Sequence, residues 1–166
     1  RPKLTHYINE LLLTFEANDK YIEAGNELLD GFLAEKIAEA ENDHIETSII
    51  LDFRPAAFIS DVDICTIFGN ALDNAIEASR QVPNPTDRYI SVYSTSTAGQ
   101  MAISFANSYV GTINEVKGLP VTTKASSRHH GYGLSSITKA LQKYDGIVSI
   151  NKDTKNKFIL TVMFPL

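Results

Sequence analysis

The sequence predicts an α+β domain, a two-layer sandwich in which helices cover one face of a mixed β-sheet, preceded by a helical segment. Apolar residues recur at helical spacing in 1–43, 61–79 and 130–144. They alternate with polar residues, as in half-buried strands, over 45–53, 88–97, 100–107, 147–152 and 157–164. Helices interleaved with such strands bury their apolar faces by packing in two layers around one core.

Composition limits the number of domains and the kind of partner. With 166 residues, 43% of them hydrophobic and 21% charged, the chain can bury one sizeable core and an appendage. Its net charge of −5 argues against nucleic acid as a partner, because binding a phosphate backbone requires a basic face.

The cysteine content and the apolar runs exclude further classes. The single cysteine, Cys65, excludes an internal disulfide and a cysteine-based metal cluster. Its position on the apolar side of its helix predicts a small buried hydrophobe. The apolar runs are far shorter than the ~20 residues of a membrane helix, and there is no signal peptide. Because the chain begins with Arg1 rather than Met, we expect a piece cut from a longer protein.

Residues 1–43 predict two helices separated at Asn18-Asp19. The apolar stripes are Leu4, Ile8, Leu11, Leu12 and Phe15 in the first, and Ile22, Leu29, Phe32, Leu33 and Ile37 in the second. One interpretation is a helical hairpin packed on the main domain. The other is a truncated hairpin that pairs with a second copy, which would cover apolar faces that nothing else in the chain covers.

The middle of the chain reads as strand, helix and hairpin. Residues 45–53 alternate as a strand, and Ser60 is placed to cap the helix that follows, with Asp63 three residues on. The strands 88–97 and 100–107 are expected to form a hairpin.

Residues 108–129 lack periodicity and are rich in Gly, Thr, Ser and Lys. A stretch of that length predicts a functional lid or a segment without fixed structure. The helix after it is expected to end at Asp145-Gly146, before strands near 147–152 and 157–164.

Two stretches carry the functional signal. On a helix, 69-GNALDNAIEAS-79 places Asn70, Asn74 and Glu77 on one face, with Asp63, Thr66 and Asp73 around them. An Asn carbonyl oxygen suits a hard cation such as Mg²⁺ when substrate phosphates complete its shell, although an Asn pair is also found on solvated helix faces.

The second stretch is 130-HGYGLSSITKALQKYDGIVSI-150, in which Gly131 and Gly133 open a helix. A Gly-x-Gly at a helix start lets the backbone approach a ligand closely, and the exposed N–H groups favour phosphate. Each glycine alone could equally serve a turn.

Together these stretches resemble the N box and G2 box of the GHKL superfamily, which includes histidine kinases, gyrase, Hsp90 and MutL. The segments GNALDNAIEAS, ISFANS, TTK...HGYGL and GNELLDGFLAEKIAEA are similar to the AgrC-like peptide-pheromone sensor kinases, close to the citrate and dicarboxylate sensors. The resemblance covers nearly the whole chain and implies the Bergerat/GHKL ATP-binding fold, with ATP and Mg²⁺ as cofactors.

The resemblance also implies roles for individual residues. Asn74 would ligate Mg²⁺ and Asn70 would face the phosphates, one turn earlier. Lys124 would bring a cation to the β- and γ-phosphates, or would simply be solvated. The residues implied for the phosphate loop and its border are His130, Gly131, Gly133 and Leu134.

Two positions depart from patterns within the superfamily. Histidine kinases carry Asp-x-Gly-x-Gly where this chain has 107-NSYVG-111, so Asn107 replaces the carboxylate that receives the adenine amino group. An Asn carbonyl oxygen still accepts that hydrogen bond. In the gyrase, Hsp90 and MutL branch, a Glu that activates water stands where this chain has Asn70. An amide is no general base at neutral pH, so Asn70 favours a kinase over an ATPase.

In the phosphoacceptor sites of the superfamily that this chain resembles, a carboxylate follows the histidine. His6, His44, His129 and His130 precede Tyr, Ile, His and Gly. The substrate histidine is therefore expected outside this chain.

The resemblance thus implies that 44–166 is the ATP-binding catalytic domain of a two-component sensor histidine kinase and 1–43 the C-terminal part of its dimerisation region. The implied partners are ATP, a second copy joined through the N-terminal helices of the parent, and a response regulator, but no nucleic acid. The parent would be a membrane-anchored bacterial sensor with this part in the cytoplasm. The alternatives are a GHKL ATPase and a degenerate GHKL module used for docking or dimerisation.

Overall fold

The computed structural model describes residues 22–111, 114–116, 119–121, 130–152 and 156–166. The first predicted stripe, from Leu4 to Phe15, and the predicted break at Asn18-Asp19 lie outside these residues. The helices and strands, in chain order, are α2 Glu27–Asn42, β1 Glu46–Ile50, α3 Asp61–Arg80, β2 Tyr89–Ser96, β3 Gln100–Ser108, β4 Asn114–Val116, β5 Leu119–Val121, α4 His130–Gln142, β6 Ile147–Lys152 and β7 Lys157–Pro165.

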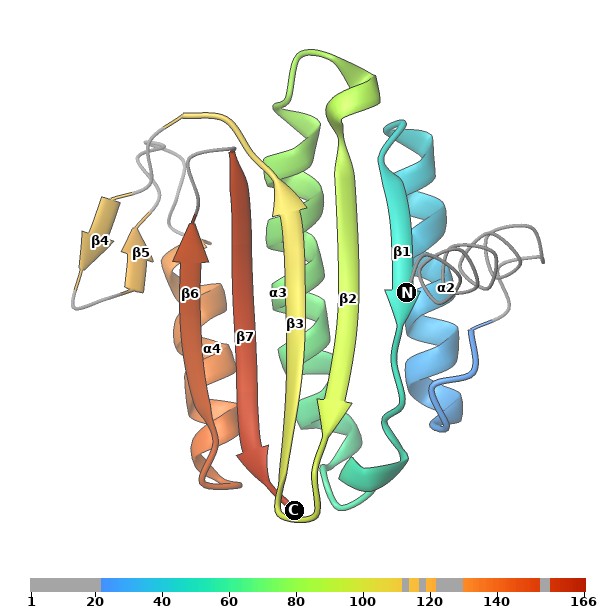
Figure 1. Cartoon of the computed structure of the whole chain (residues 1–166), viewed down its shortest axis with the longest axis vertical. Helices are drawn as coiled ribbons and strands as arrows, with labels where there is room; N and C mark the ends of the chain where they lie inside the picture. Colours follow the sequence, from blue (N-terminus) through green and yellow to red (C-terminus); the bar gives the residue numbers. More distant parts are fainter. Residues whose placement is uncertain (1–21, 112–113, 117–118, 122–129, 153–155) are drawn as a thin grey trace, which may run out of the picture.

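The main sheet has five strands in the order β1-β2-β3-β7-β6. β1 runs parallel to β2, whereas the pairs β2/β3, β3/β7 and β6/β7 are antiparallel. Helices α2, α3 and α4 all lie on one face of this sheet (Figure 1). The predicted fold class, a two-layer α+β sandwich with a mixed sheet and helices on one face, is therefore confirmed.

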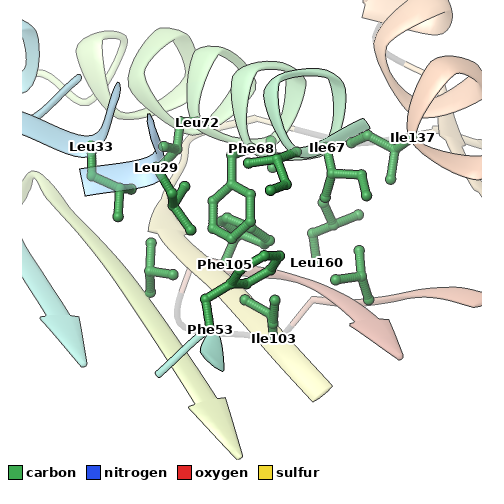
Figure 2. Packing of buried hydrophobic residues seen from close by; sticks show 14 of the residues in the cluster. Leu29, Leu33, Phe53, Ile67, Phe68, Leu72, Ile103, Phe105, Ile137 and Leu160 are labelled. Carbon is green, nitrogen blue, oxygen red and sulfur yellow. The ribbon is translucent and has the colours of Figure 1, made fainter. Parts of the chain in front are cut away.

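Helix α3 is the centre of the helical layer. Its N-cap is Ser60, whose side chain accepts a hydrogen bond from the Asp63 N–H at 3.2 Å, as predicted. Its buried face fills the core, where the Phe68 ring meets the rings of Phe53 and Phe105 edge-on, with centroids 5.7 and 5.3 Å apart (Figure 2). This apolar face fixes the rotation of α3, so its Asn residues point away from the sheet.

The second apolar stripe of the helical segment is covered by the domain itself. Leu29, Leu33 and Ala40 of α2 are buried, and all three belong to the same core cluster as the apolar face of α3. Along the contact between α2 and α3, Lys36 pairs with Asp73 and Arg80 pairs with Asp43. Helix α2 is thus packed on the sheet layer, which fits the interpretation that a helical hairpin packs on the main domain.

Of the remaining sequence predictions, several are confirmed by the structure and two are corrected. The hairpin β2/β3, the strands β6 and β7 and the end of α4 before Gly146 are confirmed, with Asp145 at a φ of 55° after the helix. The prediction that Cys65 is buried is wrong, because its side chain is exposed on the helix surface beside the exposed Val62. The stretch 108–129 is not uniformly irregular, since β4 and β5 pair there as a small two-stranded sheet.

Within the described residues, no helix is both long and apolar enough to cross a membrane.

Candidate functional site

The two sequence motifs meet where α4 begins beside the middle of α3. Gly133 is the contact point: a Cβ built on it would lie 3.3 Å from Asn70 Oδ1 and 3.4 Å from Asn74 Nδ2. A side chain here would therefore crowd Asn70 and come into contact with Asn74. The structure brings together Asn70, Asn74 and Gly133, three of the predicted site residues, from segments about sixty residues apart.

The Asn70 carboxamide is held by its own helix. Its Nδ2 donates a hydrogen bond to the Thr66 carbonyl oxygen at 2.7 Å, which leaves Oδ1 directed at α4. Because Asn Nδ2 and Oδ1 are exchanged by rotation about the last side-chain bond, this donor assignment rests on the carbonyl it faces. Asn70 therefore offers an acceptor, and no proton-accepting base, towards the start of α4.

The structure describes only part of the other residues that were predicted to bind phosphate. The backbones of His130 and Gly131 form the first turn of α4, whose N–H groups lack intrahelical partners. The side chain of His130 and the whole of Lys124 lie outside what the structure describes. The Leu134 side chain packs against the hydrophobic core, so it could serve a phosphate only through its backbone.

The carboxylates expected around the Asn face form hydrogen bonds with other side chains of the protein. Asp63, only 4% exposed, accepts hydrogen bonds from Lys143 Nζ at 2.8 Å, Tyr144 OH at 2.6 Å and Ser60 Oγ at 2.8 Å. These bonds, that to Lys143 foremost, lower the pKa of Asp63 below its ordinary value. Asp63 joins α3 to the end of α4, on the opposite side of the contact from Gly133.

Asp73 is likewise paired, although it is the direct neighbour of Asn74. Its carboxylate accepts a hydrogen bond from Lys36 Nζ of α2. Lys36 also pairs with Glu39, and these carboxylates raise its pKa against the opposing effect of burial. Asp73 is therefore engaged by α2, although it lies next to Asn74 in the chain.

Asn107 lies at the other end of the predicted site. It is the penultimate residue of β3, between Ile90 of β2 and Phe158 of β7, and is 2% exposed. Its Nδ2 donates to the Ser108 carbonyl oxygen at 2.8 Å. Within the described residues, no hydrogen bond reaches its Oδ1. A buried acceptor without a partner fits a ligand group that donates a hydrogen bond there.

Sequence reasoning missed two buried hydroxyls next to Asn107. The Ser79 side chain is fully buried, and Ser108 is 5% exposed. Ser108 Oγ donates to Ser79 Oγ at 3.0 Å and accepts from the Tyr89 N–H at 3.1 Å. A signal existed: Ser79 follows Ala75 and Ile76 at helical spacing, so it is a polar residue in an apolar face.

A separate hollow of about 840 Å³ lies where β1 and β2 begin and β3 ends. Residues that line it include Glu46, Asn84, Arg88, Tyr89 and Tyr109. Its described lining includes none of the predicted site residues, so we place the candidate site at the α3/α4 contact.

Comparison with known proteins identifies the family. A sequence model of the GHKL domain matches residues 59–165, which is more than half of the chain. The chain belongs to the GHKL family. No curated protein matches it in sequence.

Solved structures share the fold of this GHKL chain. The nucleotide-free catalytic domain of the histidine kinase ThkA aligns with a TM-score of 0.61 at 19% identity, covering 85% of this chain and 91% of that one. A mycobacterial sensor histidine kinase, MprB, aligns at 0.57 and 14% identity over 84% and 93% of the two chains. Full-length ShkA in complex with AMPPNP aligns at 0.58 and 15% identity, covering 83% of this chain and 29% of ShkA. The GHKL chain thus has the fold of histidine kinase catalytic domains.

Proposed function

We propose that the chain is the ATP-binding catalytic region of a two-component sensor histidine kinase, and that it transfers the γ-phosphoryl group of Mg-ATP to a histidine outside these 166 residues. The observation that carries the proposal is the close approach of α4 to α3 at Gly133. Because Gly133 has no side chain, the first turn of α4, whose N–H groups lack intrahelical partners, comes close to the Asn70 and Asn74 carboxamides, and this brings phosphate-binding donors together with the neutral oxygen of Asn70.

The residues present fit ATP and Mg²⁺ at both ends. The Asn74 carbonyl oxygen is a ligand type suited to Mg²⁺, and the first turn of α4 offers N–H groups to phosphate oxygens. Asn107, buried with its oxygen unpaired among the described residues, would accept the adenine amino proton. When bound, Mg²⁺ supplies charge neutralisation on the phosphates; the chain supplies positioning.

Asn70 favours a kinase over a GHKL ATPase. Its amide nitrogen is committed to the Thr66 carbonyl, and its oxygen has no accessible proton-accepting pKa. A site without a base to activate water keeps ATP intact until a histidine is presented. The docking-module alternative requires that the site bind no nucleotide, and the buried Asn107 oxygen, which has no hydrogen-bond partner among the described residues, speaks against it.

The phosphoacceptor is proposed to lie outside the chain. His44 sits in the turn between α2 and β1 with a φ of 55° and is followed by Ile45, which offers no carboxylate. His6 and His129 lie outside the described residues, and the sequence gives neither of them a following carboxylate.

The finer assignments follow from the motif resemblance. We propose that the chain belongs to the AgrC-like branch, that 1–43 is the end of the dimerisation region and 44–166 the catalytic domain. The parent would dimerise through its N-terminal helices, be anchored in the membrane with this part in the cytoplasm, and pass the phosphoryl group to a response regulator. The net charge of −5 supports the absence of nucleic acid among the partners.

Three measurements on the purified chain test the proposal. Calorimetry is expected to show Mg-dependent ATP binding, and phosphate release is expected to stay at background. Incubation with γ-labelled ATP is expected to leave the chain unlabelled, whereas the longer parent with its acceptor helix becomes labelled. Absence of ATP binding would support the docking module, rapid phosphate release an ATPase, and an acid-labile label on this chain would mean that one of its own four histidines is the acceptor.

A further inference from the structure

We propose that Ser79 and Ser108 are positioning residues that fix the orientation of the Asn107 carboxamide, and thereby make the site accept adenine and reject 6-oxopurines. The inference rests on the proposed function, since it requires a nucleotide whose base reaches Asn107.

An asparagine at this position is ambiguous in a way that an aspartate is not. A carboxylate only accepts hydrogen bonds, so it selects the 6-amino group of adenine in any orientation. A carboxamide presents either its oxygen, which suits that amino group, or its nitrogen, which suits the 6-oxo group of guanine or hypoxanthine. Selection of adenine by Asn107 therefore requires that something hold its amide in one of these two orientations.

The Ser108 carbonyl supplies that constraint. It accepts a hydrogen bond from Asn107 Nδ2 at 2.8 Å, and Asn107 is only 2% exposed. A flipped amide would set Oδ1 against the Ser108 oxygen, two acceptors without a proton between them, in a place where water cannot compensate. The orientation seen leaves Oδ1 as the atom available to a ligand.

Ser79 in turn bridges the Ser108 and Tyr89 carbonyls, between which it shares its one hydroxyl proton. Ser79 Oγ lies 3.2 Å from the Ser108 carbonyl oxygen and 3.1 Å from the Tyr89 carbonyl oxygen. Ser108 Oγ closes the network with its bonds to Ser79 Oγ and the Tyr89 N–H. Because both hydroxyls are buried, their hydrogen bonds cannot be exchanged for water, and the Ser108 peptide stays aligned with Asn107.

The arrangement also explains why one helix can serve both ends of a nucleotide. Ser79 follows Asn74 by five residues on α3, a rise of ~7.5 Å along the axis. Helix α3 thus presents a carboxamide near the phosphate end and a buried hydroxyl near the base end. A shift of α3 along its axis would therefore move the side chains at the phosphate end and at the base end together.

The test compares three Mg-nucleotides in calorimetry with the wild-type chain and Ser79→Ala. ATP carries a 6-amino group, inosine triphosphate a 6-oxo group, and purine riboside triphosphate neither. The variant is expected to bind ATP about threefold to tenfold more weakly, the effect of one hydrogen bond, and purine riboside triphosphate as the wild type does. Inosine triphosphate is expected to bind equally or more tightly, because loss of Ser79 Oγ leaves the Ser108 carbonyl, and with it the Asn107 amide, less firmly held.

Controls separate this role from a loss of fold. Ser104→Ala also removes a partly buried hydroxyl from β3, one bonded to Thr161 Oγ1 at 3.0 Å, and is expected to leave all three affinities unchanged. Ser108→Ala is the second variant if Ser79→Ala does not fold. Equal weakening of all three nucleotides, or an unchanged preference for ATP, would overturn the inference. A wild-type chain that binds none of them would overturn the proposed function itself.

Discussion

Helices α3 and α4 meet at two places that are built in opposite ways. At the start of α3, Asp63 is buried and bonded to Lys143 and Tyr144, so the contact is closed by charge. Two to three turns further on, Asn70 and Asn74 pack against Gly133, and within the described residues no hydrogen bond uses Asn70 Oδ1 or the Asn74 carboxamide. The same pair of helices is therefore joined by charge at one end, the closed contact, and has carboxamide groups left for a ligand at the other, the open contact.

The difference separates stability from binding. A buried carboxylate with three donors is costly to disturb, because removing it leaves Lys143 and Tyr144 without their partner. The glycine contact lets the two helices approach closely, and this sets how near the first turn of α4 comes to the two carboxamides. Substitutions at the closed contact should therefore change unfolding, and those at the open contact should change nucleotide binding.

The largest effect is expected from Asn74→Ala at the open contact. Loss of the carboxamide removes a proposed metal ligand from a site with few others, so ATP affinity should fall about 100-fold, or ~2.7 kcal/mol, and lose its Mg dependence. Calorimetry with and without Mg²⁺ measures both. Asn151→Ala, which removes an exposed carboxamide from β6, serves as the control. Wild-type affinity in Asn74→Ala would refute the metal role.

Next comes Asp63→Ala at the closed contact, which should lower the free energy of unfolding by about 2 kcal/mol. Urea denaturation followed by circular dichroism measures the change, and ATP affinity should move far less than in Asn74→Ala. Asp61→Ala is the matched control, because it removes an exposed acid from the same first helical turn. Equal losses in the two variants would mean that the contacts of Asp63 contribute nothing beyond the helix dipole.

The open contact could be predicted from sequence, whereas the closed one could not. Helical spacing placed Asn70 and Asn74 on one face, and the Gly-x-Gly motif placed Gly133 at a helix start, because both are local patterns. Asp63 bonds to Lys143 and Tyr144, which lie about eighty residues further along the chain. No local sequence pattern pairs residues at that separation. The same limit applied to Asp73, whose partner Lys36 lies on a different helix.

Cys65 shows a second limit. Helical spacing alone separates positions by 100°, so a residue at the border of an apolar face, such as Cys65 next to Ile64, falls on either side of the boundary. The strands and the N-cap were more predictable, because alternation and the Ser60 capping pattern act within a few residues. Whether the named site residues bind a nucleotide stays a prediction.

Gly133→Ala is expected to have a smaller effect than the two preceding variants. It should weaken ATP binding without lowering the stability of the fold. The added Cβ would meet both carboxamides at 3.3 to 3.4 Å and weaken ATP binding about tenfold, while the better helix propensity of Ala should keep or raise stability. Gly31→Ala on α2 is the matched control, since its Cβ meets nothing within 4 Å. That control should gain stability without changing ATP affinity. If both variants bind ATP equally well, the close approach of α4 to Asn70 and Asn74 at Gly133 is not needed for the ligand.

The smallest effect concerns the response of the closed contact to acid. The pKa of Asp63 is lowered in the folded state by its bonds to Lys143 and Tyr144. Its contribution is therefore fully present above the unfolded pKa of about 4 and is lost as pH falls through the folded value. Lys143 is largely exposed, so salt should screen part of this contribution. Denaturation between pH 7 and pH 2 should show a shallower acid decline for Asp63→Asn than for the wild type, and parallel curves would show that other carboxylates govern the acid limb.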